Sequence, residues 1–272
     1  MIITFIGGGN MASALIGGLQ QQGYNAQDMR VVEIFAESRE ALEKKFGVAV
    51  FASAEPALAG SDVILLAVKP QQMAQVAKGL SKQVSAGQLV VSIAAGIRTQ
   101  DLSRWLGGHT TIVRAMPNTP ALALAGMTGL YAMPGVSKAH RQTAQDLLGA
   151  AGATLWFDDE NNLDAVTALS GSGPAYVFYF LEAMQQAGIE LGLSKAAARS
   201  LGICTFLGAA KLAAESPDDA ATLRARVTSK GGTTERALSV MEAAQVKMTL
   251  IDAIKQAAAR SQELGDEMGK TA

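Results

Sequence analysis

The chain has 272 residues, of which 49% are hydrophobic and 17% are charged, so it is long enough for two folded domains. This composition argues against an intrinsically disordered protein. The formal net charge is −1, with both signs scattered along the sequence, which argues against nucleic acid as a partner. No uninterrupted apolar segment reaches the length of a membrane span.

The cysteine content and the N-terminal stretch bear on the compartment. The single cysteine, Cys204, rules out an intramolecular disulfide, and its apolar surroundings predict a small buried residue. The first residues, MIITFIGGGN, lack the basic region and the long apolar stretch of a signal peptide. We therefore expect a cytoplasmic protein.

The first half of the chain alternates short apolar runs with helical patterns. The runs are rich in Val and Ile, as expected of strands buried on both faces of a parallel sheet. They cover residues 2–6, 29–35, 62–68, 88–94 and 111–116, and the helices predicted between them include 10–22, 37–46 and 70–80. This repetition predicts a doubly wound α/β domain over residues 1–163.

The second half, residues 164–272, predicts an all-α domain because strand signals disappear. One helix begins near Pro174, a residue suited to a first helical position, and another begins after Ser194 as N-cap. Apolar residues nearly encircle both helices, so every side needs cover. A partner subunit is one cover, and the first domain alone is the alternative.

A glycine-rich turn follows the first strand and opens the first helix. Gly7, Gly9 and Ala12 match G-x-G-x-x-G/A, in which glycines allow a tight turn and a close approach to a pyrophosphate. Amides at the helix start then face the phosphates. The sequence thus predicts a Rossmann-type domain whose cofactor contacts include Gly7, Gly8, Gly9, Asn10 and Met11.

The end of the second predicted strand concerns the adenosine ribose. Glu33 lies about 20 residues beyond the glycines, where a carboxylate accepts hydrogen bonds from both ribose hydroxyls of NAD and repels the phosphate of NADP. Arg39 lies nearby and instead favours that phosphate. Glu33 as an ordinary exposed residue is the third alternative, and the sequence leaves NADH and NADPH open.

Three other strand ends carry small residues and prolines. In a doubly wound sheet, ligands collect beyond the carboxyl ends of the strands, so these segments predict a pocket wall for a flat ring. Each alone is more often a plain turn. The further cofactor contacts that we expect are Ala67, Val68, Lys69, Pro70, Ala94, Ala95 and Asn118.

No metal-ligand cluster, carboxylate pair or Ser/His/Asp arrangement stands out, so we expect no metal. The two histidines, His109 and His140, lie in polar contexts that favour solvated side chains. If the protein is an enzyme, the cofactor does the chemistry and the protein positions the substrate.

The stretch VTSKGGTTERAL interrupts helix-forming sequence in the last third of the chain. A helix that restarts at about Thr233 leaves amides unpaired at its first turn, which suits a carboxylate. Gly231 and Gly232 remove side-chain bulk, and Ser229, Thr233 and Thr234 add hydroxyls. A tight turn with threonine caps is the plainer alternative, but it leaves the double glycine unexplained.

Together, FIGGGNMA, AVKP, SIAAG, RAMPNTPAL, DAVTALSGSGPAYVF and VTSKGGTTE resemble pyrroline-5-carboxylate reductases over nearly the whole chain. The resemblance implies reduction of 1-pyrroline-5-carboxylate to L-proline with NADPH or NADH. It also implies dimers that interlock through the helical domain, often assemble into decamers, and share the active site between subunits.

The resemblance assigns the substrate, a cyclic imino acid, to residues 229–234. Ser229, Lys230, Gly231, Gly232, Thr233 and Thr234 are its implied contacts, with the Thr234 hydroxyl on the ring nitrogen. Lys230 stands where many members have proline, and we expect it to face solvent. Two rivals remain: a non-catalytic nicotinamide-dinucleotide sensor, and a β-hydroxyacid dehydrogenase, whose catalytic lysine has no counterpart here before Lys195.

Overall fold

The computed structural model describes residues 1–270, and the chain forms two compact units. Among the described residues, one unit contains Met1–Ser172 and residues 256–270, and the other contains Gly173–Lys255. This division into compact units falls after Ser172, nine residues beyond the predicted domain boundary at 163, and it places residues 256–270 with the first unit.

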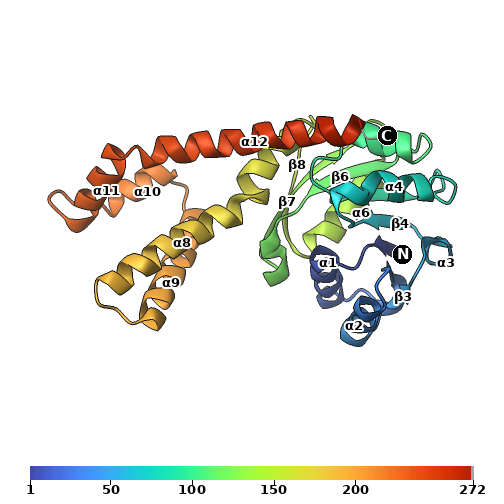
Figure 1. Ribbon diagram of the computed structural model, residues 1–272, viewed down its shortest axis with the longest axis horizontal. Coiled ribbons are helices and arrows are strands. Elements are labelled where there is room, and N and C mark those ends of the chain that lie inside the picture. The colour runs from blue at the N-terminus through green and yellow to red at the C-terminus, as the bar shows by residue number, and fades with distance from the viewer. Residues whose placement is uncertain (271–272) are drawn as a thin grey trace. The chain divides into compact units, whose positions relative to one another are not determined.

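The first unit is built on an eight-stranded sheet with the order β3-β2-β1-β4-β5-β6-β7-β8 (Figure 1). All five predicted strands are confirmed: β1 (Ile3–Ile6), β2 (Met29–Val32), β4 (Val63–Leu66), β5 (Leu89–Ser92) and β6 (Ile112–Met116). They pair in parallel, and the order reverses between β1 and β4. Ligands bind at such a switch point in open α/β sheets.

Three further strands were not predicted: β3 (Ala49–Phe51), β7 (Gly126–Ala132) and β8 (Gly152–Trp156). β7 runs antiparallel to β6, and β8 pairs with β7 in parallel. Gly129 in β7 shows why the pattern was hard to read, since glycine is a poor strand former. A Cβ on this residue would lie 2.7 Å from the Val166 side chain, so packing requires glycine there.

Helices cover both faces of the sheet. The elements of the first unit are α1 (Asn10–Gln21), η1 (Ala26–Asp28), α2 (Ala36–Phe46), α3 (Ala54–Leu58), α4 (Pro70–Leu80), α5 (Thr99–Trp105), η2 (Thr119–Ala123), α6 (Lys138–Gly149), α7 (Asn162–Val166) and the π-helical turn η3 (Thr167–Gly171). The predicted helices at 10–22, 37–46 and 70–80 are confirmed within one residue at each end.

Successive strand residues point to opposite faces and build two cores. Phe5, Leu65 and Val91 pack with α1, α2 and α6, whereas Ile64 and Leu66 pack with α3, α4 and α5. Because both faces are covered, the central strands are apolar without alternation, which is the pattern that revealed them.

The second unit is helical throughout, as predicted. Its elements are α8 (Gly173–Glu190), α9 (Lys195–Glu215), α10 (Ala220–Arg226), α11 (Thr233–Ala243) and the first part of α12 (Val246–Lys270). The Ser194 hydroxyl caps α9 by accepting from the Ala197 amide at 3.2 Å. Within residues 1–270, no helix combines the length and the apolar character needed to cross a bilayer.

Burial differs from expectation at two residues. Cys204, expected to be buried, is exposed on α9 in the single chain. His109, expected to be solvated, is 9% exposed, and its Nε2 atom has no hydrogen-bond partner among the described residues. Burial lowers the pKa of His109 from its usual value.

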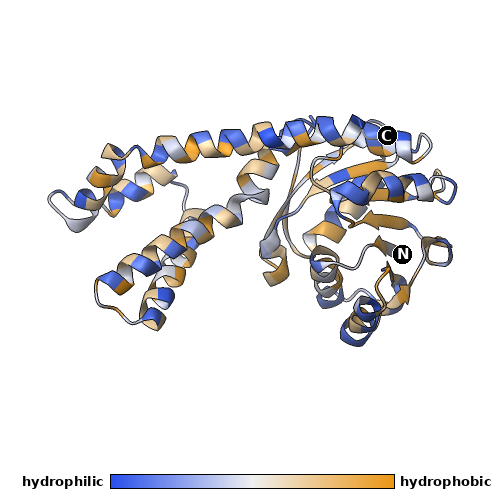
Figure 2. Cartoon of the chain, in the orientation of Figure 1, coloured by the Kyte–Doolittle hydropathy of each residue, from blue (hydrophilic) through white to orange (hydrophobic). Residues whose placement is uncertain are grey.

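Apolar residues lie along α8 and α9, alternating with polar ones (Figure 2). In the single chain Phe178 is 63% exposed and Leu207 is 68% exposed. Apolar side chains of this size that are largely exposed on neighbouring helices are typical of a surface that another protein covers.

Candidate active site

The glycine loop connects β1 to α1 at the switch point of the sheet. Gly7 has φ of +101°, and a Cβ there would lie 2.8 Å from the carbonyl oxygen of Ala67. Gly8 packs so closely on Leu42 that a side chain would overlap it, whereas Gly9 faces open space. The motif is therefore explained by geometry: two glycines fit close contacts and the third leaves the loop accessible.

The first turn of α1 is open to an anion. Gly9 is the N-cap, no acidic residue occupies the first turn, and Asn10 is exposed. No acidic side chain within the first turn itself therefore offsets the positive end of the helix dipole. Ala12 is fully buried and lets the helix pack against the sheet. These features fit the pyrophosphate of a dinucleotide.

Glu33 lies beside the glycine loop. Its Oε2 atom accepts from the Gly8 amide at 3.1 Å, and its Oε1 atom accepts from the Phe35 amide at 3.1 Å. The Arg39 guanidinium donates to the carbonyl oxygens of Glu33 at 2.7 Å and Ile34 at 2.9 Å. The carboxylate therefore lies beside the glycine loop, at the end of β2 where the sequence predicts a ribose-binding group.

The ends of β4 and β5 follow at the same edge of the sheet. The Ala67 amide donates to the Ile6 carbonyl at 2.8 Å, which fixes the start of the turn that leads through Val68 to α4. Lys69 is the exposed N-cap of α4 and Pro70 is its first residue. After β5, Ala94 is buried and Ala95 is half-buried. The structure therefore brings the predicted segments next to the glycine loop.

Asn118, predicted as a cofactor contact, also has a structural task. Its Nδ2 donates to the Ser170 carbonyl at 3.1 Å, and its Oδ1 accepts from the Met127 amide at 2.9 Å. The side chain thereby joins the start of β7 to the π-helical turn η3. Such turns are frequent at functional sites.

The predicted substrate loop, residues 229–234, connects α10 to α11. As expected, a helix begins at Thr233, with Gly232 as its N-cap. No described backbone hydrogen bond uses the amides of Thr233 and Thr234, and no described contact uses the hydroxyls of Ser229 and Thr234. Donors therefore converge at the helix start, as a carboxylate site requires.

The double glycine has a local explanation that the sequence argument missed. Gly231 has φ of +74°, which disfavours other residues. A Cβ on Gly232 would lie 2.7 Å from the Ser229 hydroxyl, and the Gly232 amide donates to the Ser229 carbonyl at 3.0 Å. The turn itself thus demands both glycines. Lys230 is exposed, as expected.

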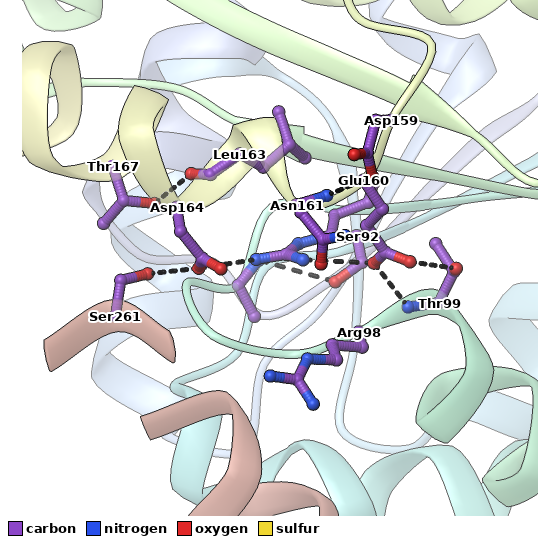
Figure 3. A network of polar contacts seen from close by, with 12 residues as sticks. Ser92, Arg98, Thr99, Asp159, Glu160, Asn161, Leu163, Asp164, Thr167 and Ser261 are labelled. Carbon is purple, nitrogen blue, oxygen red and sulfur yellow. Dashed lines mark hydrogen bonds and ion pairs between the residues drawn. The ribbon is translucent and has the colours of Figure 1, made fainter. Parts of the chain in front are cut away.

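A buried polar network was not predicted (Figure 3). The Arg114 side chain on β6 is 5% exposed and contacts Glu160 at 3.1 Å and Asp164 at 4.0 Å. Glu160 also accepts from the Thr99 amide at 2.8 Å and the Thr99 hydroxyl at 2.7 Å. Asp164 accepts from the Ser261 hydroxyl on α12 at 2.7 Å. The network fixes the start of α5, which follows the Ala94–Ala95 turn.

A signal for this network was present in the sequence. An arginine in the apolar run TIVRAM lies in a strand buried on both faces, and a buried charge needs partners. Its partners lie 46 and 50 residues later in the chain, at Glu160 and Asp164, so no local pattern connects them.

Hollows elsewhere in the first unit include the following two. One of about 510 Å³ is lined by residues that include Met1, Asp62 and Gln88, and one of about 650 Å³ lies between α4 and the end of α12. Neither is lined by the glycine loop.

Comparison with known proteins matches both halves of the chain. Residues 160–264 match the family model described as pyrroline-5-carboxylate reductase dimerisation, and residues 2–96 match NADP oxidoreductase coenzyme F420-dependent. A pyrroline-5-carboxylate reductase of Pseudomonas aeruginosa is 47% identical over 268 residues, which cover 98% of each chain.

Solved structures agree over the full length. A pyrroline-5-carboxylate reductase of Coxiella burnetii superposes with a TM-score of 0.90 at 40% identity, covering 96% of this chain and 97% of that one. The Plasmodium falciparum pyrroline carboxylate reductase, solved with NADP bound, has a TM-score of 0.88 at 27% identity, covering 97% and 98%. The chain belongs to the pyrroline-5-carboxylate reductase family.

Proposed function

We propose that this chain reduces 1-pyrroline-5-carboxylate to L-proline, the last step of proline biosynthesis, with NADPH or NADH. The 47% identity to a reductase along 98% of the chain supports this function. Two features of the structure support this function: the glycine loop is open at Gly9, and the amides at the start of α11 have no described partner.

The cofactor residues fit a dinucleotide. Gly7, Gly8, Gly9, Asn10 and Met11 would hold the pyrophosphate, Glu33 the ribose, and Ala67, Val68, Lys69, Pro70, Ala94, Ala95 and Asn118 would line the rest of the site. When bound, NADPH or NADH supplies the hydride that is added to C5 of the ring. One proton from the medium completes the conversion of the C=N bond to an amine.

The substrate residues would bind and orient the ring. The amides of Thr233 and Thr234 would hold the carboxylate, with Ser229, Lys230, Gly231 and Gly232 forming the rest of the loop. The Thr234 hydroxyl would hydrogen-bond the ring nitrogen. A threonine hydroxyl is a poor acid, so its contribution is orientation rather than proton transfer.

The first test measures oxidation of NADH and NADPH in parallel, with 1-pyrroline-5-carboxylate as acceptor. Rapid oxidation of either supports the proposal, and the ratio of the two reports the effect of Glu33. Cofactor binding without oxidation would favour the nicotinamide-sensor alternative.

The second test replaces the proposed orienting hydroxyl. Thr234→Ala should lower turnover roughly 10- to 100-fold, because misplaced reactants lose rate steeply, while cofactor affinity stays nearly intact. Thr234→Ser keeps a hydroxyl and should recover much of the rate. Equal loss of turnover and cofactor affinity in Thr234→Ala would contradict the assigned role.

Assembly and compartment extend the proposal. The dimerisation model matched at residues 160–264 and the exposed apolar helices support a homodimer. We further infer that dimers assemble into decamers, which light scattering on the purified protein tests by mass. NADPH and NADH are supplied inside the cell, which supports function in the cytoplasm.

A further inference from the structure

The substrate loop is closed by a side chain that follows it. Glu235 lies in the first turn of α11, and its Oε2 atom accepts from the Gly231 amide at 2.6 Å. A glutamate three residues after the N-cap usually binds back to the N-cap amide itself. Here the N-cap amide, that of Gly232, already donates to the Ser229 carbonyl at 3.0 Å. Glu235 therefore binds the amide one residue earlier.

This contact sorts the donors of the loop into two sets. The amides of Gly231 and Gly232 are used within the loop, by Glu235 and by Ser229 respectively. The amides of Thr233 and Thr234 have no described backbone partner. An incoming carboxylate thus meets only the second set, at the helix start.

The contact also stabilises a conformation that the backbone alone does not favour strongly. Gly231 has φ of +74°, and a Cβ added to it would meet nothing within 4 Å, so no neighbouring group packs against that side of the residue. Glycine carries the largest conformational freedom of any residue. One charge-assisted hydrogen bond to its amide is the described interaction that restrains it.

We propose that Glu235 is a positioning residue for the imine substrate: it fixes Gly231 and so holds the Thr233 and Thr234 amides in a preorganised carboxylate site. This inference rests on the proposed function of residues 229–234. The competing reading is that the Glu235 carboxylate occupies the anion site and that the substrate must displace it. The two readings predict opposite changes in KM.

The test compares three variants in the full-length enzyme. Glu235→Ala should raise KM for 1-pyrroline-5-carboxylate about three- to tenfold, the range expected for one exposed hydrogen bond, with KM for the nicotinamide cofactor unchanged. Glu235→Gln keeps an acceptor for the Gly231 amide and should restore KM to near the wild-type value. Glu242→Ala, an exposed glutamate on the same helix, is the matched control and should change neither constant.

Three results would overturn the inference. An unchanged or lowered KM in Glu235→Ala would show that the carboxylate is neutral or competes with substrate. A Glu235→Gln variant as impaired as Glu235→Ala would show that the charge, and not the acceptor, matters. An equal effect of Glu242→Ala would show a general effect on α11.

A second measurement does not depend on turnover. Amide hydrogen exchange of a peptide containing Gly231 should be faster in Glu235→Ala than in the wild type and in Glu235→Gln. If the wild type oxidises neither cofactor, the proposed function fails, while this exchange pattern still tests the restraint on the loop. Equal exchange in all three proteins would remove the structural basis of the inference.

Discussion

Replacing Arg114 with methionine should destabilise the first unit strongly. The Arg114 guanidinium is buried between Glu160 and Asp164, whose side chains are 18% and 8% exposed. Methionine retains much of the aliphatic stem but removes the charge that faces both carboxylates. Breaking a buried ion pair by removing one partner costs about 3 to 5 kcal/mol.

The remaining contacts cannot compensate the two carboxylates equally. Glu160 keeps the amide and the hydroxyl of Thr99, whereas Asp164 keeps the Ser261 hydroxyl. The melting temperature of Arg114→Met should fall by roughly 6 to 20 °C, since each kcal/mol shifts a chain of this size by about 2 to 4 °C. Thermal unfolding followed by circular dichroism measures this change.

A combined variant identifies the cause of the loss. Arg114→Met with Glu160→Gln and Asp164→Asn removes the uncompensated charges and should be more stable than Arg114→Met alone, because neutral replacement of a buried ionic cluster is often well tolerated. A loss below about 1 kcal/mol in the single variant, or no recovery in the combined one, would refute the reasoning.

Three other predictions concern burial. Burial lowers the pKa of His109 in the folded protein. The stability that this neutral histidine contributes is therefore complete above the unfolded pKa of about 6.5 and is lost as the pH falls through the lowered pKa. The urea midpoints measured at pH 7.5 and at pH 5.5 should differ less in His109→Gln than in the wild type. A Cβ on Gly18 would overlap the Ala150 carbonyl, so Gly18→Ala should destabilise by about 1 to 3 kcal/mol, whereas Gly17→Ala, with 3.5 Å to its nearest neighbour, should not. In the wild type, Cys204 should resist labelling by a maleimide because the proposed dimer covers α9. In Leu207→Asp, the added charge should weaken the dimer and Cys204 should react. Equal labelling of the two proteins would argue against a covered α9 surface.

The sequence predicted the centre of the fold because burial on both faces leaves a strong pattern. β1, β2, β4, β5 and β6 are apolar along most of their length, and short apolar runs between helices are typical of strands buried in a parallel sheet. β7 and β8 were not predicted because each contains glycine, a poor strand former that close packing requires at these positions. A Cβ on Gly126 would lie 2.8 Å from the Ala151 carbonyl. Packing of this kind is invisible until the partner strand is in place.

The site was predictable where the backbone conformation demands a residue type. Gly7 and Gly231 both have positive φ, and each stood out as glycine in a segment that otherwise forms a helix or a strand end. Contacts between side chains were not predictable in the same way. In the sequence, Glu235 is indistinguishable from any other glutamate in a first helical turn. Its partner in the structure is the Gly231 amide, because the Gly232 amide already donates to the Ser229 carbonyl.

The exposed apolar helices connect the wrong prediction for Cys204 with the proposed assembly. Leu201, Cys204 and Leu207 follow one another at intervals of three residues on α9, so they lie close to one face of the helix. Leu201 is 57% exposed and Leu207 is 68% exposed, and Cys204 is exposed between them. In the single chain the prediction that Cys204 is buried is wrong. In the proposed homodimer a second copy would cover this face of α9, and the apolar pattern would then reflect the assembly rather than the single chain.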